Sequence, residues 1–118
     1  MTVKRIVANM LTAEPGRAKS FYGGIFDMHP VMDHGWIQTY AAGGDPAGAQ
    51  LSFAGEGGSG APVPDLSIEV EDLDSVLAKV EAAGFPIEYG PAEEPWGVRR
   101  FFLRDPFGRL VNVLAHRA

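Results

Sequence analysis

Polar side chains that could do chemistry alternate with aliphatic ones along residues 65–71. Asp65, Ser67 and Glu69 occupy every second position of this segment. Successive side chains of a strand point to opposite faces, so the pattern predicts a strand with one polar face. A carboxylate on such a face could hold a polar ligand, or could transfer a proton if burial raised its pKa. Asp65 and Glu69 are therefore candidate ligand-binding and acid–base residues.

The same alternation extends the polar set to other predicted strands. It adds Arg100, Phe102 and Asn112, and the guanidinium of Arg100 could bind an anionic group or pair with Asp65 or Glu69. Carboxylates, amides, an arginine and aromatic rings together suit a small polar or zwitterionic molecule with a planar part. The full predicted ligand-binding set is Asn9, Trp36, Gln38, Tyr40, Gln50, Asp65, Glu69, Trp96, Arg100, Phe102 and Asn112.

The aromatic and imidazole side chains allow more than one interpretation. Trp36 and Tyr40 share a strand face, where they either stack on a ligand or fill the core. Trp96 follows Glu94-Pro95 in a predicted loop, which favours a pocket lip or a dimer contact. We expect the histidines to be solvent-exposed or locally bonded; they are His29, His34 and His116.

Two halves of the chain carry the same succession of elements. The first half predicts a strand over 4–11, a helix that starts near Thr12–Pro15 and ends at Gly23-Gly24, and strands near 30–33, 35–42 and 48–54. Gly43-Gly44-Asp45-Pro46 predicts the turn between the last two of these strands.

The second half repeats this order after a Gly- and Pro-rich linker at 55–64. It predicts a strand over 65–71, a helix capped by Asp72 and ended by Gly84, and a strand at 87–89. A loop over 90–97 and strands at 98–104 and 109–115, joined by an Asp-Pro-x-Gly turn, complete it. The fold class is therefore α+β: a single domain over 1–118 with βαβββ modules at 1–54 and 65–118. We expect their mixed sheet to curl around a concave cavity, and the pairing of modules within a chain or between subunits stays open.

Composition excludes several classes of protein. The 118 residues carry a formal charge of −5 and contain no cysteine, so a disulfide framework or a zinc–thiolate site is excluded. A nucleic-acid partner is not expected because there is no broad basic face. No apolar run is long enough for a membrane span and no secretory signal is evident, so we expect a cytoplasmic protein.

Two segments resemble a known superfamily. FYGGIFDM at 21–28 and EPWGVRRFFLRDPFGRLVNV at 94–113 are similar to signatures of the vicinal oxygen chelate superfamily, especially its bleomycin-resistance-type and glyoxalase-like members. The resemblance implies paired βαβββ modules and a homodimer. Metal-dependent members hold a divalent ion with side chains from the first, fourth, fifth and eighth strands. Those positions look like Val7, Gln50, Asp65 and Asn112 here, which departs from the usual His or Gln, Glu, His and Glu.

This departure from the family pattern favours a binding protein over a metalloenzyme, because these residues do not form a glyoxalase-type metal site. No metal or cofactor is expected, although Asp65, Glu69 and waters could hold a hard ion such as Mg²⁺. Our first hypothesis is that a dimeric cavity binds and sequesters a small molecule, and the excess of acidic residues favours a cationic one. The alternative is a glyoxalase-like lyase, isomerase or dioxygenase that uses a non-standard metal site or acid–base chemistry by Glu69 or Asp65. A ferredoxin-like regulatory domain is disfavoured because each half carries one strand too many.

Overall fold

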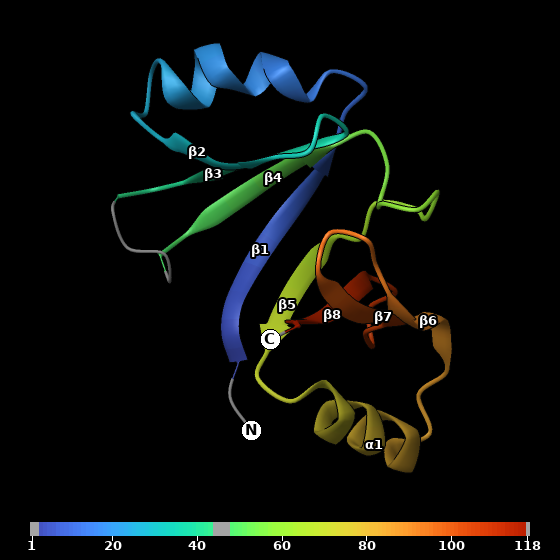
Figure 1. The fold of residues 1–118 in the computed structure, drawn as a ribbon. Coiled ribbons are helices and arrows are strands. Elements are labelled where there is room, and N and C mark those ends of the chain that lie inside the picture. Colours follow the sequence, from blue (N-terminus) through green and yellow to red (C-terminus); the bar gives the residue numbers. More distant parts are fainter. Residues whose placement is uncertain (1–2, 44–47, 118) are drawn as a thin grey trace. The chain divides into compact units, whose positions relative to one another are not determined.

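The computed structural model describes residues 3–43 and 48–117 (Figure 1). The chain divides into two compact units, which we call the N-terminal unit (Val7–Val63) and the C-terminal unit (Met1–Ile6 with Pro64–Ala118). The predicted α+β class and mixed sheet are confirmed, since parallel and antiparallel strand pairs occur together with few helices. The cavity predicted between the modules stays a prediction. No helix among the described residues is long and apolar enough to cross a membrane.

The sheet of the N-terminal unit has the strand order β2-β3-β4-β1. Its strands are the Val7–Leu11 part of β1 (Val3–Leu11), β2 (His29–Asp33), β3 (Ile37–Ala41) and β4 (Gln50–Ala54). The first residues of β1, including Arg5, belong to the C-terminal unit. β1 runs parallel to β4, and the other pairs are antiparallel. One face packs into a core around Ala18, Tyr40 and Phe53. The four strands predicted here are confirmed, while Gly44, Asp45 and Pro46 of the predicted turn lie outside the described residues.

The helix predicted after Thr12 is wrong in type. The segment forms a short 3₁₀ helix η1 (Pro15–Arg17) followed by a π-helix η2 (Lys19–Gly23). The wide turn is closed by the Gly24 amide, which donates to the Lys19 carbonyl at 2.9 Å, five residues back. A Cβ at Gly24 would lie 2.4 Å from the Ser20 carbonyl oxygen, so this close approach requires glycine.

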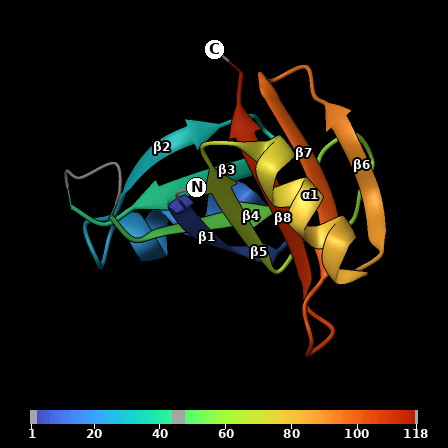
Figure 2. The same cartoon turned by 90° about the horizontal axis from the view of Figure 1, so that it is seen from below.

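The sheet of the C-terminal unit has the strand order β5-β8-β7-β6. Its elements are β5 (Leu66–Val70), α1 (Leu73–Ala83), β6 (Ile87–Glu93), β7 (Val98–Arg104) and β8 (Leu110–His116). The helix α1 lies over the strands of this unit (Figure 2). Its apolar stripe packs on β5, β7 and β8 in a core formed by Ile68, Val70, Leu73, Val76, Leu77, Val80, Phe101, Leu103, Val111, Val113 and Ala115.

Both predicted caps of α1 are confirmed. The Asp72 carboxylate accepts a hydrogen bond from the Ser75 amide at 3.1 Å. This satisfies one of the amides that a helix N-terminus leaves without an intrahelical partner. Gly84 adopts the left-handed conformation with φ +83° and ends the helix.

Removing the Asp72 cap is expected to lower stability. The variant Asp72→Ala leaves the first-turn amide without its side-chain acceptor, and such losses cost about 1 kcal/mol of unfolding free energy. Urea unfolding followed by circular dichroism measures the change. An equal effect from Asp72→Asn, which keeps an acceptor, would show that capping is not the cause.

The loop predicted at 90–97 is partly wrong because β6 continues to Glu93. Its register against β7 shifts between Tyr89 and Ala92, which is a bulge rather than a turn. Gly90 makes this bulge fit: its φ is +79°, and a Cβ there would lie 2.5 Å from the Arg100 carbonyl oxygen. The Gly-Pro pair therefore marks an irregularity inside a strand.

Candidate functional site

The side of the C-terminal sheet opposite α1 carries polar residues, and we call it the polar face. Strand alternation sends Phe101 and Leu103 into the core under α1, so their β7 neighbours Arg100 and Phe102 take the other side. By the same alternation on β5 and β8, the polar face carries Ser67, Glu69, Arg100, Phe102, Asn112 and His116.

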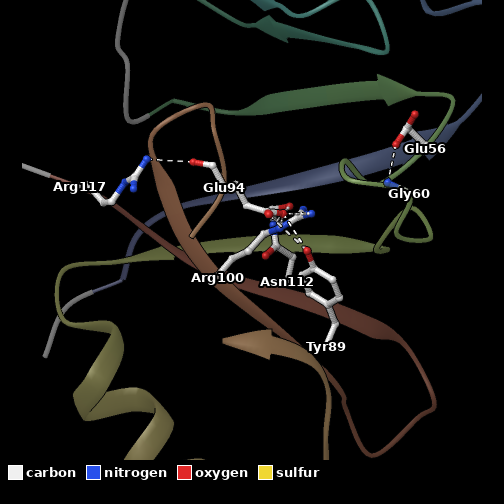
Figure 3. Close-up of polar contacts among 8 residues, drawn as sticks. Glu56, Gly60, Tyr89, Glu94, Arg100, Asn112 and Arg117 are labelled. Atoms are coloured by element: carbon white, nitrogen blue, oxygen red, sulfur yellow. Dashed lines mark hydrogen bonds and ion pairs between the residues drawn. The ribbon is translucent and has the colours of Figure 1, made fainter. Parts of the chain in front are cut away.

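A buried ion pair dominates the polar face. Arg100 is 3% exposed and Glu94 is 4% exposed. Arg100 Nε donates to Glu94 Oε2 at 2.8 Å, and a terminal nitrogen of Arg100 also contacts this oxygen. The Tyr89 hydroxyl donates to the same carboxylate at 3.0 Å (Figure 3). A buried pair of this kind compensates its desolvation only through such additional hydrogen bonds.

Three aromatic rings surround the Arg100 guanidinium. Its central carbon lies 5.2 Å from the ring centroid of Tyr89, 5.0 Å from that of Trp96 and 4.8 Å from that of Phe102. These separations are within the range of cation–π attraction. The rings and Glu94 together fix the guanidinium in one place.

The turn between β6 and β7 positions Glu94. The Glu94 amide donates to the Val98 carbonyl at 2.8 Å, and the Gly97 amide donates to the Glu94 carbonyl at 3.1 Å. Arg117 also donates to that carbonyl, at 2.9 Å (Figure 3). Backbone hydrogen bonds thus hold the carboxylate over β7.

Asn112 lies beside this ion pair with one polar atom unsatisfied (Figure 3). The residue is 7% exposed, and its Nδ2 donates to Ser67 Oγ at 3.1 Å. Within the described part of the chain, its Oδ1 is buried and has no hydrogen-bond partner. Leaving a buried acceptor unpaired costs about 1–3 kcal/mol, so this oxygen favours a donor from water or a ligand.

A second cluster on the polar face surrounds Glu69, which is 5% exposed. Arg5 Nε donates to Glu69 Oε1 at 2.9 Å, and a terminal Arg5 nitrogen contacts the same oxygen. His116 Nδ1 lies 2.6 Å from Oε2. Burial alone would raise the pKa of Glu69, but the hydrogen bonds and charges of Arg5 and His116 together lower it. A carboxylate with a lowered pKa is a weak general base.

The lowered pKa of Glu69 makes stability depend on pH. Because the folded-state pKa lies below the ordinary value of 4.5, the stabilisation is complete above that pH. It is lost as the pH falls through the lowered folded-state value. Urea unfolding of the wild type and Glu69→Gln should show a stability difference that is constant near pH 6 and shrinks below about pH 4.5. A difference that grew in acid would contradict this assignment.

Asp65 plays a structural part. Its carboxylate accepts from the Leu110 amide at 2.9 Å. Ser67 on β5 pairs with Asn112 on β8. In the N-terminal unit, Val7 on β1 pairs in the same way with Gln50 on β4. The register therefore places Ser67, not Asp65, beside Asn112.

The predicted site residues of the N-terminal unit divide between two faces. Tyr40 is 2% exposed in the core, and its hydroxyl donates to Gln38 at 2.9 Å. Gln38 and Tyr40 pair with Phe53 and Leu51, on the core side. This placement favours the core alternative for Tyr40. The neighbouring positions of β3 and β4 face the opposite side of the sheet from Gln38 and Tyr40. They include Thr39, Gln50 and Ser52, which are all buried. Asn9 pairs with Ser52 on β4, and Trp36 stacks on His34 before β3.

The sequence pattern missed several partners in the C-terminal unit. Arg100 pairs with Glu94, so the expected pairing with Asp65 or Glu69 is wrong. Glu94 lies in a predicted loop, where side chains do not alternate. Tyr89 lies between two shifts in the register of β6 against β7, so the alternation of β7 does not predict which β7 residue it faces. The expected exposure of His116 is confirmed, since its side chain is 53% exposed. Its contact with Glu69, 47 residues away in the sequence, was not predicted.

The side chains present do not fit a glyoxalase-type metal ion. Paired Val7 and Gln50 offer one neutral amide, and paired Ser67 and Asn112 offer a hydroxyl and an amide. Transition metals favour imidazole and carboxylate ligands instead. In the described ranges, no three His, Asp or Glu residues gather as a metal-binding group.

An apolar groove lies on the opposite side of the C-terminal unit. Its volume is about 280 Å³, and α1, β7 and the turn that follows β7 form its walls. The lining includes Val76, Val80, Phe85 and Leu103, with Lys79 among them. This groove offers few hydrogen-bonding groups, in contrast to the polar face.

Comparison with known proteins identifies the family. Residues 4–113 match the model of the Glyoxalase/Bleomycin resistance protein/Dioxygenase superfamily. No curated protein matches the sequence. A crystal structure described as NAD-dependent benzaldehyde dehydrogenase from Legionella pneumophila has TM-score 0.73 and 15% identity, covering 95% of this chain and 99% of that one.

Two other similar structures have descriptions that name an enzyme. Methylmalonyl-CoA epimerase from Mycobacterium tuberculosis has TM-score 0.64 and 17% identity, with 98% of this chain and 88% of that chain covered. The Mn(II)-bound glyoxalase from Novosphingobium aromaticivorans has TM-score 0.60 and 19% identity, with 96% and 38% covered. At these identities the solved structures share the fold alone, whereas the family model spans nearly the whole chain. The chain therefore belongs to the glyoxalase/bleomycin resistance protein/dioxygenase superfamily.

Proposed function

We propose that this protein binds and sequesters a small molecule at Asn112, on the polar face of the C-terminal unit. The observation that carries the proposal is Asn112 Oδ1, a buried acceptor without a partner among the described residues. The neighbouring Glu94–Arg100 pair already neutralises its own charges. The ligand therefore presents an N–H or O–H donor to Asn112.

Residues around Asn112 favour retention of the ligand over its conversion. Glu94 is bound by Arg100 and Tyr89, so its carboxylate is engaged within the protein. Ser67 Oγ accepts from Asn112. These groups can orient a ligand.

Ligand screening by thermal shift tests this proposal. Candidate compounds are bleomycin-type cations, other antibiotics and glutathione thioesters. A compound that raises the melting temperature of the wild type should lose about tenfold or more in affinity with Asn112→Leu, which removes the acceptor. Val76→Ala, which alters the α1 side, is the matched control and should bind as the wild type does. Failure of every compound class to shift the melting temperature would oppose the proposal.

A homodimer in the cytoplasm completes the proposal. The N-terminal unit exposes Phe21, Ile25 and Phe26 by 50%, 64% and 60%. Apolar residues exposed together favour a protein contact. Light scattering coupled to size exclusion should give twice the mass of one chain, and a monomer at micromolar concentration would oppose it.

An enzyme of the same superfamily is the second candidate, because similar structures are described as an epimerase and a glyoxalase. Engagement of Glu69 by Arg5 and His116 and of Asp65 by Leu110 disfavours either carboxylate as the base. Elemental analysis of protein purified without chelator separates the candidates. Stoichiometric Ni, Zn, Fe or Mn that is lost in Asp65→Ala would favour the enzyme.

A further inference from the structure

The contact between His116 and Glu69 has the geometry of a carboxylate–imidazole dyad. A carboxylate oxygen only accepts hydrogen bonds, so the 2.6 Å contact requires the proton on His116 Nδ1. In the neutral imidazole, Nε2 then carries the lone pair. This arrangement fixes both the tautomer and the direction of the ring.

Burial and a second partner hold the carboxylate in place. Glu69 is 5% exposed, and Arg5 occupies its other oxygen. The His116 side chain is 53% exposed, so the imidazole remains open to solvent. The cluster thus joins a buried positioning group to an accessible nitrogen.

Arg5 adds a positive charge next to the imidazole. It binds Oε1 of Glu69 while His116 binds Oε2, so the two basic side chains flank one carboxylate. A guanidinium there can stabilise negative charge that develops on an acyl oxygen. Among the described residues, His116 contacts a carboxylate, whereas His29 and His34 do not.

We propose that His116 is a nucleophilic site for small activated acyl compounds, with Glu69 as its positioning residue. Nε2 attacks the acyl carbon, a C–N bond forms, and the bond between that carbon and the leaving oxygen breaks as the alkoxide or phenolate departs. The product is an acyl-imidazolium. Water attacks its acyl carbon and gives one proton to the departed alkoxide or phenolate, and the C–N bond breaks with its electron pair returning to Nε2. The carboxylic acid leaves, its proton passes to solvent, and the neutral imidazole is restored.

This site is separate from the proposed ligand site. His116 lies four residues beyond Asn112 on β8, which corresponds to about 13 Å along a strand. The two sites therefore depend on different side chains of β8. The inference goes beyond sequestration and can fail independently of it.

Hydrolysis of p-nitrophenyl acetate by the intact protein tests the proposal. Release of p-nitrophenolate should fall about tenfold or more in His116→Gln, while His29→Gln and His34→Gln keep the wild-type rate. Added imidazole should raise the rate with His116→Ala above the rate given by the same imidazole without protein. Equal rates for the wild type and His116→Gln would overturn the proposal.

The ratio of the two His116 tautomers distinguishes a positioning role of Glu69 from a purely structural one. A structural role alone would leave this ratio unchanged in Glu69→Gln. Nitrogen-15 NMR of the wild type should show the Nδ1–H form, and Glu69→Gln should shift the population towards Nε2–H and slow the reaction. An Nε2–H form in the wild type would overturn the proposal even if Glu69→Gln failed to fold. Ligand-induced thermal shifts should be the same in His116→Gln and the wild type, which separates this test from that of the proposed function.

Discussion

Glu94→Ala is expected to lower the free energy of unfolding by about 3–5 kcal/mol. The change leaves the Arg100 guanidinium, 3% exposed, without its carboxylate partner. It also removes the acceptor of the Tyr89 hydroxyl. The first loss leaves a buried charge without its carboxylate, which costs more than the net value of the contact itself. Urea unfolding at pH 7 measures the effect.

Two further variants separate the ion pair from simple truncation. The exposed pair of Glu88 and Arg104 is the matched control, and Glu88→Ala should cost less than about 1 kcal/mol. The double variant Glu94→Leu with Arg100→Met removes both charges and should recover most of the lost stability. If the double variant were less stable than Glu94→Ala, the burial of an unpaired charge would not explain the loss.

Phe101→Ala is expected to cost about 3–5 kcal/mol of unfolding free energy. The ring is 0% exposed and packs between β7 and α1 in the core of the C-terminal unit. Its removal leaves a cavity that the surrounding strands can fill only in part.

Phe107 provides the matched control because it makes the same change at a surface position. It is 86% exposed in the turn before β8, so Phe107→Ala should change stability by less than about 0.5 kcal/mol. Calorimetric unfolding of both variants measures the comparison. Equal losses at the two positions would contradict the assignment of Phe101 to the core.

Local signals in the sequence predict most elements of the C-terminal unit. Asp72 and Gly84 bound α1 because capping depends on residues within one turn of the helix end. The π-helix η2 could not be predicted in this way. Its wide turn depends on the close approach of Gly24 to the Ser20 carbonyl, while the apolar spacing of 18–25 is equally typical of an α-helix.

The sequence predicts those residues of the candidate site that lie within regular strands, because their side chains alternate between the two faces. Alternation places Arg100 and Phe102 on one side of β7 and Phe101 on the other. It cannot identify Glu94 as the partner of Arg100, because a bulge separates Glu94 from the regular part of β6. His116 ends β8 and meets Glu69 from a neighbouring strand, a contact that depends on register rather than on spacing.

The central claim is that Asn112 Oδ1 receives a hydrogen bond from a bound small molecule. NMR titration of a compound identified by thermal shift tests it most directly, through the side-chain amide signals of Asn112 and the Nε signal of Arg100. We expect both signals to shift at saturation and Asn112→Leu to weaken the binding. Shifts confined to the apolar groove around Val76, Lys79 and Phe85, with the Asn112 signals unchanged, would contradict it.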